Sequence, residues 1–333
     1  MNKALLDSHW RGCTQRIAFD TLHGTRPKFD MPLLLEQACD MFSRIQRGLM
    51  TTLPSALTRV LIAAFVLAMA PGAVSAQAMT VDQGNALQSA AAKGDAHALS
   101  ELMKAANNGD KNAQNNMGDL FADGQGVVQD YAQAAAWLRK AADQGVADAQ
   151  NDLGYLYENG LGVPVDYAQA ATWYRKAADQ GFANAQSNLG HLYDNGLGVP
   201  QDYAQAAVWY RKAADQGVAS AQKNLGILYD SGLGVPHDYA QAAAWYRKAA
   251  DQGDAGAQNR LGVLYDNGFG VGRDYVIAYA LFNLASINYS RAASNRDDMS
   301  VHMTADQIAQ GQRLSQRMKD MGVLKALDSM AAR

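Results

Sequence analysis

The clearest candidate for covalent chemistry is the segment Ser220–Lys223, which reads S-x-x-K. In this spacing a lysine can lie beside a serine hydroxyl and activate it as a nucleophile against β-lactam rings. The companion motifs S-D-N and K-T-G are absent from the sequence, and the other copies of this segment have Asn, Asp or Gly in place of Ser220. A secreted hydrolase acting on β-lactams or cell-wall material is therefore the weaker alternative, and we expect no catalytic residues.

Histidine, glycine and cysteine patterns do not indicate a cofactor site. The four histidines after residue 76 have no histidine four residues away and no paired carboxylate at metal-ligand spacing. Gly-x-Gly pairs such as Gly196 and Gly198 follow predicted helices rather than strands, which is typical of turns and not of a phosphate-binding loop. Both cysteines, Cys13 and Cys39, lie in the first 49 residues. We therefore predict no metal, no cofactor and no disulfide after residue 76.

Most of the chain after residue 110 is an internal repeat, which contains Ser220 and Lys223. The segment Asp202–Gly217 reads DYAQAAVWYRKAADQG, and nearly the same sixteen letters occur at three other places in the chain. They belong to five consecutive units of 36 residues without an insertion, which are Lys111–Val146, Ala147–Phe182, Ala183–Val218, Ala219–Asp254 and Ala255–Ser290. A fixed period of this length indicates a solenoid, in which each unit buries its apolar face against its neighbours.

Each unit is predicted to be a pair of helices. In the third unit the apolar residues of Ala183–Asp194 follow helical spacing, and Asn195-Gly196 ends that helix. Asp202 then stands at an N-cap, and a second helix covers Tyr203–Asp215. We therefore predict an all-α fold, an α/α superhelical solenoid of 36-residue helix hairpins.

Residues that recur in every unit are expected to be structural. Large aromatic side chains would fill the core, small residues would let helices approach closely, and the repeated Arg211-Lys212 pair would form a solvated helix face. The predicted core tryptophans are Trp137, Trp173, Trp209 and Trp245, and the predicted close-approach glycines are Gly154, Gly190, Gly226 and Gly262.

The two ends of the chain differ from the repeat. Val60–Ala70 is an apolar run followed by Pro71 and by small residues up to Ala76, which is typical of a signal peptide over residues 50–76. An uncleaved membrane anchor is the alternative. Residues 1–49 are expected to be an upstream extension with a mis-assigned start, and residues 77–110 and 291–333 are expected to be capping helices. Thr304 and Gln307 form a capping-box pattern at the start of a helix that reaches about Met321.

The repeated pattern closely resembles the Sel-one-like repeat family, which is related to the tetratricopeptide repeats. The residues that carry this resemblance are Ala-x-x-x-Leu-Gly-x-x-Tyr-x-x-Gly-x-Gly-Val followed by Asp-Tyr-x-x-Ala-x-x-Trp-Tyr-x-x-Ala-Ala-x-x-Gly, over residues 111–290. The resemblance implies a helical superhelix that works as an adaptor or scaffold for protein partners. The disulfide in each repeat of some secreted members, and the lipidated cysteine of outer-membrane members, have no counterpart here.

Recognition is expected where the five copies differ. When each unit is numbered from its first residue, positions 2, 5, 9 and 12 form one stripe of the first helix, opposite the core. We expect this stripe to line a concave surface and to bind a peptide. The predicted contact residues are Asn115, Asp119, Asn151, Tyr155, Glu158, Ser187, His191, Asp194, Lys223, Ile227 and Val263. The alternative is that these positions merely tolerate solvent, or that the C-terminal helices cover Ile227 and Val263.

The net charge argues against nucleic-acid binding, and the export signal indicates a protein that acts outside the cytoplasm. The net charge of −3 gives no basic surface for nucleic acid. We therefore predict an exported, non-catalytic scaffold, periplasmic or secreted, that binds a protein or peptide and does not stay in the membrane after signal cleavage. An effector that engages host proteins is a second alternative.

Overall fold

The computed structural model describes residues 79–331, and these form fifteen helices. The first helices of the five units are α6 (Lys111–Asp123), α8 (Ala147–Asn159), α10 (Ala183–Asn195), α12 (Ala219–Ser231) and α14 (Ala255–Asn267). The second helices are α7 (Tyr131–Asp143), α9 (Tyr167–Asp179), α11 (Tyr203–Asp215), α13 (Tyr239–Asp251) and α15 (Tyr275–Ala285). Helices α4 (Val81–Ala92) and α5 (Ala96–Asn107) precede them, and α16 (Ser290–Ser300), α17 (Ala305–Met321) and α18 (Val323–Ala331) follow.

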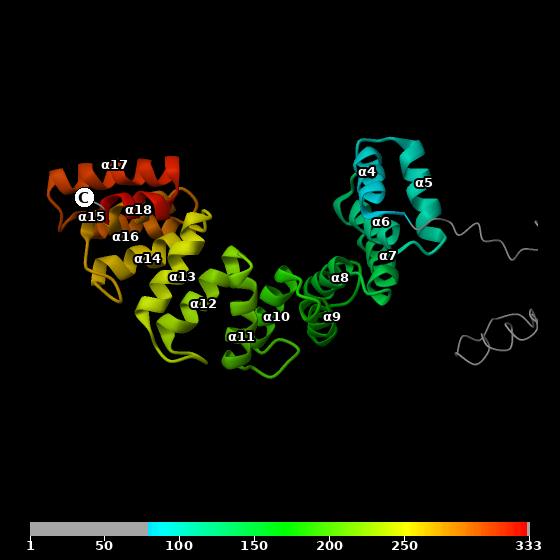
Figure 1. Cartoon of the computed structure of the whole chain (residues 1–333), viewed down its shortest axis with the longest axis horizontal. Coiled ribbons are helices and arrows are strands. Elements are labelled where there is room, and N and C mark those ends of the chain that lie inside the picture. The colour runs from blue at the N-terminus through cyan, green and yellow to red at the C-terminus, as the bar shows by residue number, and fades with distance from the viewer. Residues whose placement is uncertain (1–78, 332–333) are drawn as a thin grey trace, which may run out of the picture. The chain divides into compact units, whose positions relative to one another are not determined.

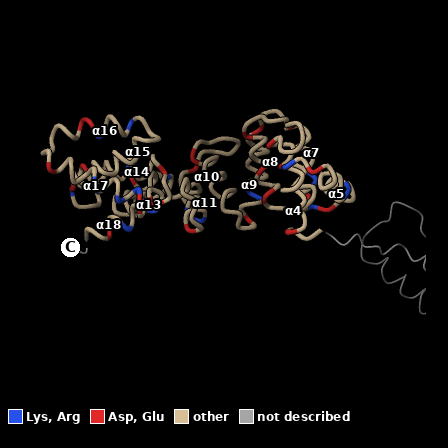
Figure 2. The backbone as a smooth tube through the Cα atoms, turned by 90° about the horizontal axis from the view of Figure 1, so that it is seen from above, with Lys and Arg blue, Asp and Glu red and all other residues tan. Residues whose placement is uncertain are grey.

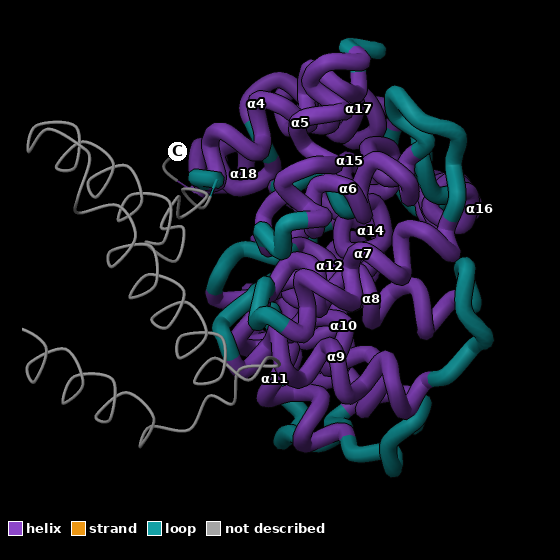
Figure 3. The backbone as a smooth tube through the Cα atoms, turned by 90° about the vertical axis from the view of Figure 1, so that its right-hand side faces the viewer, coloured by secondary structure: helices purple, strands orange, loops and turns teal. Residues whose placement is uncertain are grey.

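From α4 to α16 the helices pack in chain order, each against the next, whereas α17 packs on α15 (Figure 1). Figure 3 shows helices joined by loops and no strand within residues 79–331. The prediction of an all-α solenoid of 36-residue hairpins is therefore confirmed. Acidic and basic residues are both scattered along the described chain (Figure 2). The predicted signal peptide and the upstream extension lie outside the described residues.

Local chemistry fixes the ends of the helices within each unit. The side chain of Asp202 accepts the backbone N–H of Gln205 at 3.0 Å and so caps α11. Helix α10 ends at Gly196, which adopts the left-handed conformation with a φ of 69°. The loop glycine Gly198 has a φ of 67°, and a Cβ on it would lie 2.2 Å from the backbone carbon of Tyr167. The loop therefore rests on the first residues of the preceding unit's second helix, where no side chain fits.

Consecutive aromatic residues join neighbouring units. Trp209 is 5% exposed and packs with Leu189 and Ala170 in one buried cluster, whereas Tyr210 is fully buried in the next cluster, with Leu225. Two adjacent residues of α11 thus belong to two different layers of the core. Trp173 and Trp245 are equally buried, and the corresponding Trp137 at the first unit is partly exposed.

Polar side chains also connect the units. The side-chain amide of Gln216 donates to Gln186 Oε1 at 2.8 Å, and Gln186 in turn donates to the carbonyl of Ala178 in the preceding unit at 3.2 Å. The same Gln pair occurs in units 1, 2 and 4. In each pair the glutamine of the first helix (Gln114, Gln150, Gln186 or Gln222) is buried, whereas its donor partner is exposed. The sequence analysis assigned no role to the buried glutamines. They give buried backbone carbonyls a donor in a region where water is excluded.

The interpretation of Arg211 as part of a solvated face is wrong. Its guanidinium donates to the hydroxyl of Tyr229 in the next unit and lies 5.6 Å from the Tyr229 ring and 5.7 Å from the Trp245 ring. Its neighbour Lys212 is exposed, with Nζ 3.9 Å above the Trp209 ring. A guanidinium can stack on aromatic faces and donate in the same plane, which suits it to the seam between units.

The terminal helices differ in part from the expectation. Within residues 77–110, helix α4 begins at Val81, where Thr80 and Gln83 form a capping box that was not predicted. The capping box at Thr304 and Gln307 is present and opens α17. Helix α16 was not predicted. It packs on α15, and α18 lies against α13, where Asp251 accepts the backbone N–H of Leu324 at 2.9 Å.

Candidate partner-binding face

Residues at positions 2, 5, 9 and 12 of the first helices form a continuous row from unit to unit, which we call the first-helix face. Side chains from successive units meet along it. His191 Nε2 lies 3.9 Å from Glu158 Oε1, and Ser187 Oγ lies 3.3 Å from Ser220 Oγ. The first helices of neighbouring units are therefore close enough for their side chains to cover one another.

Position 5 is buried in the first three units, contrary to the expectation that it faces a ligand. Asn115, Asn151 and Ser187 are 6%, 9% and 7% exposed. Asn151 Oδ1 accepts a hydrogen bond from Asn188 of the next unit at 3.1 Å, and Ser187 Oγ lies 3.3 Å from Ser220 Oγ. The neighbouring first helix covers this position, so these side chains bind each other and are not free to hold a peptide backbone.

In units 2 to 4 the carboxylate at position 12 accepts a hydrogen bond from a buried tyrosine hydroxyl. Tyr174 donates to Glu158 at 2.6 Å, and the corresponding tyrosines of units 3 and 4 donate to Asp194 at 3.3 Å and Asp230 at 3.1 Å. Burial and the acceptor Glu158 raise the pKa of Tyr174 above its ordinary value, so the hydroxyl stays a donor. Glu158 and Asp194 were predicted as partner contacts, but the structure uses their carboxylates, like that of Asp230, first inside the unit.

Position 9 contains the side chains that remain available. Tyr155 is 51% exposed and Val263 is 36% exposed, whereas Ile227 is half-buried. His191 is exposed, and its Nδ1 lies 3.0 Å from the Asn195 side-chain amide. Helix α16 does not cover Ile227 or Val263 completely, because both line an open pocket.

The N-terminal end of the face is acidic. Asp119 on α6 accepts a hydrogen bond from Gln88 of α4 at 3.1 Å and one from Asn115 at 3.3 Å. Burial, followed by the nearby charges of Asp152 and Asp148, raises the pKa of Asp119 to about 7. Burial and Asp148 raise the pKa of Asp152 to about 6. The charged forms of this pair are therefore disfavoured in the folded chain.

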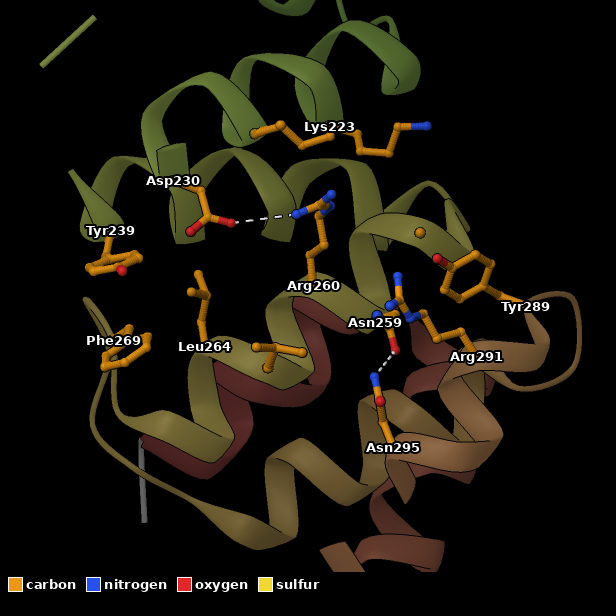
Figure 4. Close-up of a pocket in the computed structure, with 13 residues that line it drawn as sticks. Lys223, Asp230, Tyr239, Asn259, Arg260, Leu264, Phe269, Tyr289, Arg291 and Asn295 are labelled. Atoms are coloured by element: carbon orange, nitrogen blue, oxygen red, sulfur yellow. Dashed lines mark hydrogen bonds and ion pairs between the residues drawn. The ribbon is translucent and has the colours of Figure 1, made fainter. Parts of the chain in front are cut away.

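The C-terminal end of the face contains a pocket of about 560 Å³ between α12, α14 and the start of α16 (Figure 4). We call it the C-terminal groove. Its apolar residues are Ile227, Val263, Leu264 and Phe269, its cations are Lys223, Arg260 and Arg291, and its other lining residues are Asp230, Tyr239, Gly256, Asn259, Tyr289 and Asn295. This volume lies within the range of about 300–1,000 Å³ that is typical of ligand pockets.

The two ends of the groove differ in chemistry. At one end the rings of Tyr239 and Phe269 stack with their centroids 4.8 Å apart (Figure 4). At the other end Asn295 of α16 donates to Asn259 Oδ1 at 2.8 Å, beside Tyr289 and Arg291. Arg260 lies between the two ends, paired with Asp230. The groove can therefore accept an apolar group and an anionic group at the same time.

Sequence reasoning named three residues of this groove and missed its cations other than Lys223. Arg260 stands at position 6, outside the proposed stripe, where the other units have Asn or Asp. Phe269 stands in the loop at position 15, where units 2 to 4 have Leu. A comparison of every variable position, rather than of one stripe, could have found both. Arg291 lies on the helix that was not predicted.

The candidate nucleophile is not arranged for acyl transfer. Ser220 is exposed and its recorded hydrogen bond is with Ser187, whereas the Lys223 ammonium lies 3.6 Å from Asp254 Oδ2. A lysine acting as base would need to contact the serine hydroxyl. Among residues 79–331, no group of three or more His, Cys, Asp or Glu side chains is placed to hold a metal ion. No helix in this part of the chain is long and apolar enough to cross a membrane.

Comparison with known proteins agrees with this geometry. The Sel1 repeat model matches residues 111–146, 147–182, 183–218, 219–254 and 255–288. The solved structure of c5321, a protective antigen of uropathogenic Escherichia coli strains with an SLR fold, is 34% identical with a TM-score of 0.51. That match covers 76% of this chain and 64% of the antigen, so this chain spans less than two thirds of the antigen's length. A Sel1 repeat protein from Oxalobacter formigenes is 35% identical with a TM-score of 0.57, covering 63% of this chain and 85% of that one. A search of the curated proteins finds no match.

Proposed function

The chain belongs to the Sel1 repeat family, whose members are generally helical scaffolds for protein interaction, and on that premise we propose that it is an exported scaffold without catalytic activity. Its partner is a protein or peptide that binds along the first-helix face. The units are joined mainly by packing of the second helix of one unit on the first helix of the next. The first-helix face is the side of the first helices on which the copies differ.

One observation carries this proposal. At position 9 the side chain changes from Asp119 to Tyr155, His191, Ile227 and Val263, while the buried residues around it recur. Tyr155 is a large aromatic side chain that is 51% exposed. Exposed aromatic residues at the centre of an interface commonly contribute most of its binding energy. We infer that Tyr155 and His191 anchor the partner.

Site-specific photo-crosslinking tests which face binds. A photoreactive phenylalanine derivative placed at Tyr155, His191 or Val263 is expected to give discrete adducts in cell-envelope extracts. Val208, which lies on second helix α11 and is 49% exposed, is the matched control position. Adducts from Val208 that are absent from the three first-helix positions would contradict the proposed face.

Replacement of the two anchors gives the energetic test. Tyr155→Ala with His191→Ala is expected to weaken capture of the crosslinked partner by at least about tenfold, which corresponds to about 1.4 kcal/mol. Both side chains are exposed, so the unfolding temperature is expected to change little. Unchanged capture by the folded double variant would contradict the role of Tyr155 and His191.

Export rests on the N-terminal sequence. The apolar run Val60–Ala70 and the small residues that end at Ala76 are typical of a cleaved signal. The expected mature N-terminus is Gln77. N-terminal sequencing of the protein from the cell envelope and from the culture medium tests cleavage and distinguishes a periplasmic from a released protein. A protein that retains residues 50–76 would contradict cleavage.

A further inference from the structure

The C-terminal groove exists because small and long side chains are combined at this one place in the repeat. Position 2 is Gly256 in unit 5, whereas it is Asn, Asp or Ser in the other units, and position 9 changes from Tyr155 and His191 to Ile227 and Val263. A Cβ on Gly256 would lie 3.4 Å from Cδ of Lys223, so the lysine stem runs directly over the glycine. Ile227 and Val263 are smaller than Tyr155 and His191, which occupy the same position in units 2 and 3, and so they leave more space between the helices.

The charges around this space favour an anion. Three cations, Lys223, Arg260 and Arg291, line the groove together with one carboxylate, Asp230. Asp254, outside the lining, pairs with Lys223 at 3.6 Å. Even with Asp254 included, the groove has one more cation than carboxylates, whereas the whole chain carries a net charge of −3. The excess positive charge is therefore local to this site.

The positive charge is accessible. The side chain of Arg260 is 45% exposed although it pairs with Asp230, and Arg291 is exposed at the first turn of α16. Asp230 already accepts the Tyr246 hydroxyl at 3.1 Å, so its carboxylate stays satisfied if Arg260 turns toward a ligand. Arginine binds carboxylates through two parallel N–H donors, which makes it selective for this group.

The apolar part of the groove adds a second requirement. Val263 and Phe269 are 36% and 43% exposed, and Phe269 is held by its stack on Tyr239. An apolar side chain placed here would remove this surface from water, which makes the free energy of binding more favourable. A free inorganic anion would use only the cations and leave the apolar surface in water.

We propose that the C-terminal groove binds an acidic peptide segment of the partner protein, in which an Asp or Glu side chain lies close to an aromatic or large aliphatic one. The carboxylate contacts Arg260 and Arg291, and the apolar side chain packs between Val263 and Phe269. The inference rests on the proposed function, because it names the chemistry of the partner that the first-helix face would bind. Its contribution depends on exposed charges, so binding weakens as the salt concentration rises.

Selection from a random dodecapeptide phage library on the folded chain tests the inference without knowledge of the partner. Enriched peptides are expected to contain Asp or Glu within two residues of Phe, Trp, Tyr, Leu or Ile. Synthetic copies with a fluorescent label then give dissociation constants by polarisation. Replacement of their acidic residues by Gln or Asn is expected to weaken binding at least about tenfold.

Matched variants locate the binding site. Arg260→Ala with Arg291→Ala is expected to weaken binding at least about tenfold, and Val263→Glu, which keeps both arginines, is expected to weaken it similarly. Arg313→Ala with Lys325→Ala removes two exposed cations from α17 and α18 outside the groove and is expected to change binding less than about twofold. Unfolding temperatures show whether each variant is folded.

The outcomes separate this inference from the proposed function. Peptides that bind but are rich in Lys and Arg, or that are insensitive to both groove variants while sensitive to Tyr155→Ala, overturn the groove and leave the scaffold function standing. Peptides that respond equally to the control variant overturn it as well, since bulk charge would then explain binding. Failure to enrich any peptide, together with absence of first-helix crosslinks, contradicts both.

Discussion

The backbone of Gly190 lies directly against the ring of Tyr210, so that a methyl group on this glycine would approach Tyr210 Cδ1 to 2.8 Å. The corresponding distance to Cδ1 is 2.7 Å both for Gly154 against Tyr174 and for Gly226 against Tyr246. The two helices of each unit touch at this point. Because no van der Waals contact is that short, any side chain at this glycine must move the tyrosine or separate the helices.

Gly190→Ala is therefore expected to lower the free energy of unfolding by about 1–3 kcal/mol, although alanine favours helices. Gly256→Ala is the control, because a methyl there meets only side-chain atoms of Asp254 and Lys223, at 3.1 and 3.4 Å. Denaturant unfolding followed by circular dichroism measures both. Equal stability of the two variants would show that the helices can separate without cost.

Trp209 is expected to act through its buried ring and not through its N–H. Its Nε1 has no hydrogen-bond partner among the described residues, and the same holds for Trp173 and Trp245. Trp209→Phe should therefore cost about 1–2 kcal/mol of unfolding free energy, from lost apolar area, while Trp209→Ala should cost about 3–5 kcal/mol. Denaturant titrations of the two variants give the comparison. A Phe variant as damaged as the Ala variant would point to an essential polar contact of the indole.

Arg211 is expected to stabilise the junction between units 3 and 4. Arg211→Ala removes the bond to Tyr229 and the stack on Trp245, at an expected cost of about 1–2 kcal/mol. Lys212→Ala is the neighbouring control and should cost about 0.5–1 kcal/mol, because its exposed ammonium contacts one ring. Hydrogen exchange is expected to rise in α12 and α13 for the first variant. A change confined to α11 would argue against a role between units.

Protonation of Asp119 and Asp152 should stabilise the N-terminal units. Their folded-state pKa values, about 7 and about 6, lie above the ordinary aspartate pKa of 3.8. The folded chain therefore binds protons more tightly than the unfolded chain. The resulting contribution to the free energy of unfolding is fully present below about pH 4 and is lost as the pH rises through 6 and 7. We expect slower hydrogen exchange, corrected for intrinsic rates, in α6 and α8 at pH 5 than at pH 8.

Asp119→Asn should remove most of this pH dependence and raise the stability of α6 and α8 at pH 8 by about 1–2 kcal/mol. Asp328→Asn removes an exposed carboxylate of α18 and should leave the dependence intact. If the Asp119→Asn variant kept the full pH dependence of hydrogen exchange, titratable groups other than Asp119 would be responsible for it.

The S-x-x-K segment should not react with β-lactams. The recorded contacts of Ser220 and Lys223 are with Ser187 and Asp254, not with each other. Incubation of the purified chain with a chromogenic β-lactam is expected to give no turnover and no acylated protein by mass spectrometry. Loss of a measured turnover in Ser220→Ala would restore the hydrolase alternative.

The ends of the repeat helices could be predicted because they depend on local chemistry. Asp202 and Gly196 define a cap and a stop within a few residues of their own positions, so no distant contact is needed. Helix α16 could not be predicted in this way. Its sequence SRAASNRDDMS has few apolar residues, and the helix packs on α15 with Ala292 buried and Asn295 bonded to Asn259 of α14. Tertiary packing, not local propensity, holds it.

The sequence by itself determined the solenoid, its 36-residue period and the buried aromatic residues, because these follow from spacing that every copy repeats. It also determined which residues of a first helix share one side. Only the tertiary structure decided how much of that side stays open. The next first helix covers Asn151 and Ser187, buried tyrosines engage Glu158 and Asp194, and the C-terminal groove forms only where units 4 and 5 meet α16. Helical spacing sets the direction of a side chain, whereas exposure depends on the neighbouring element that lies over it.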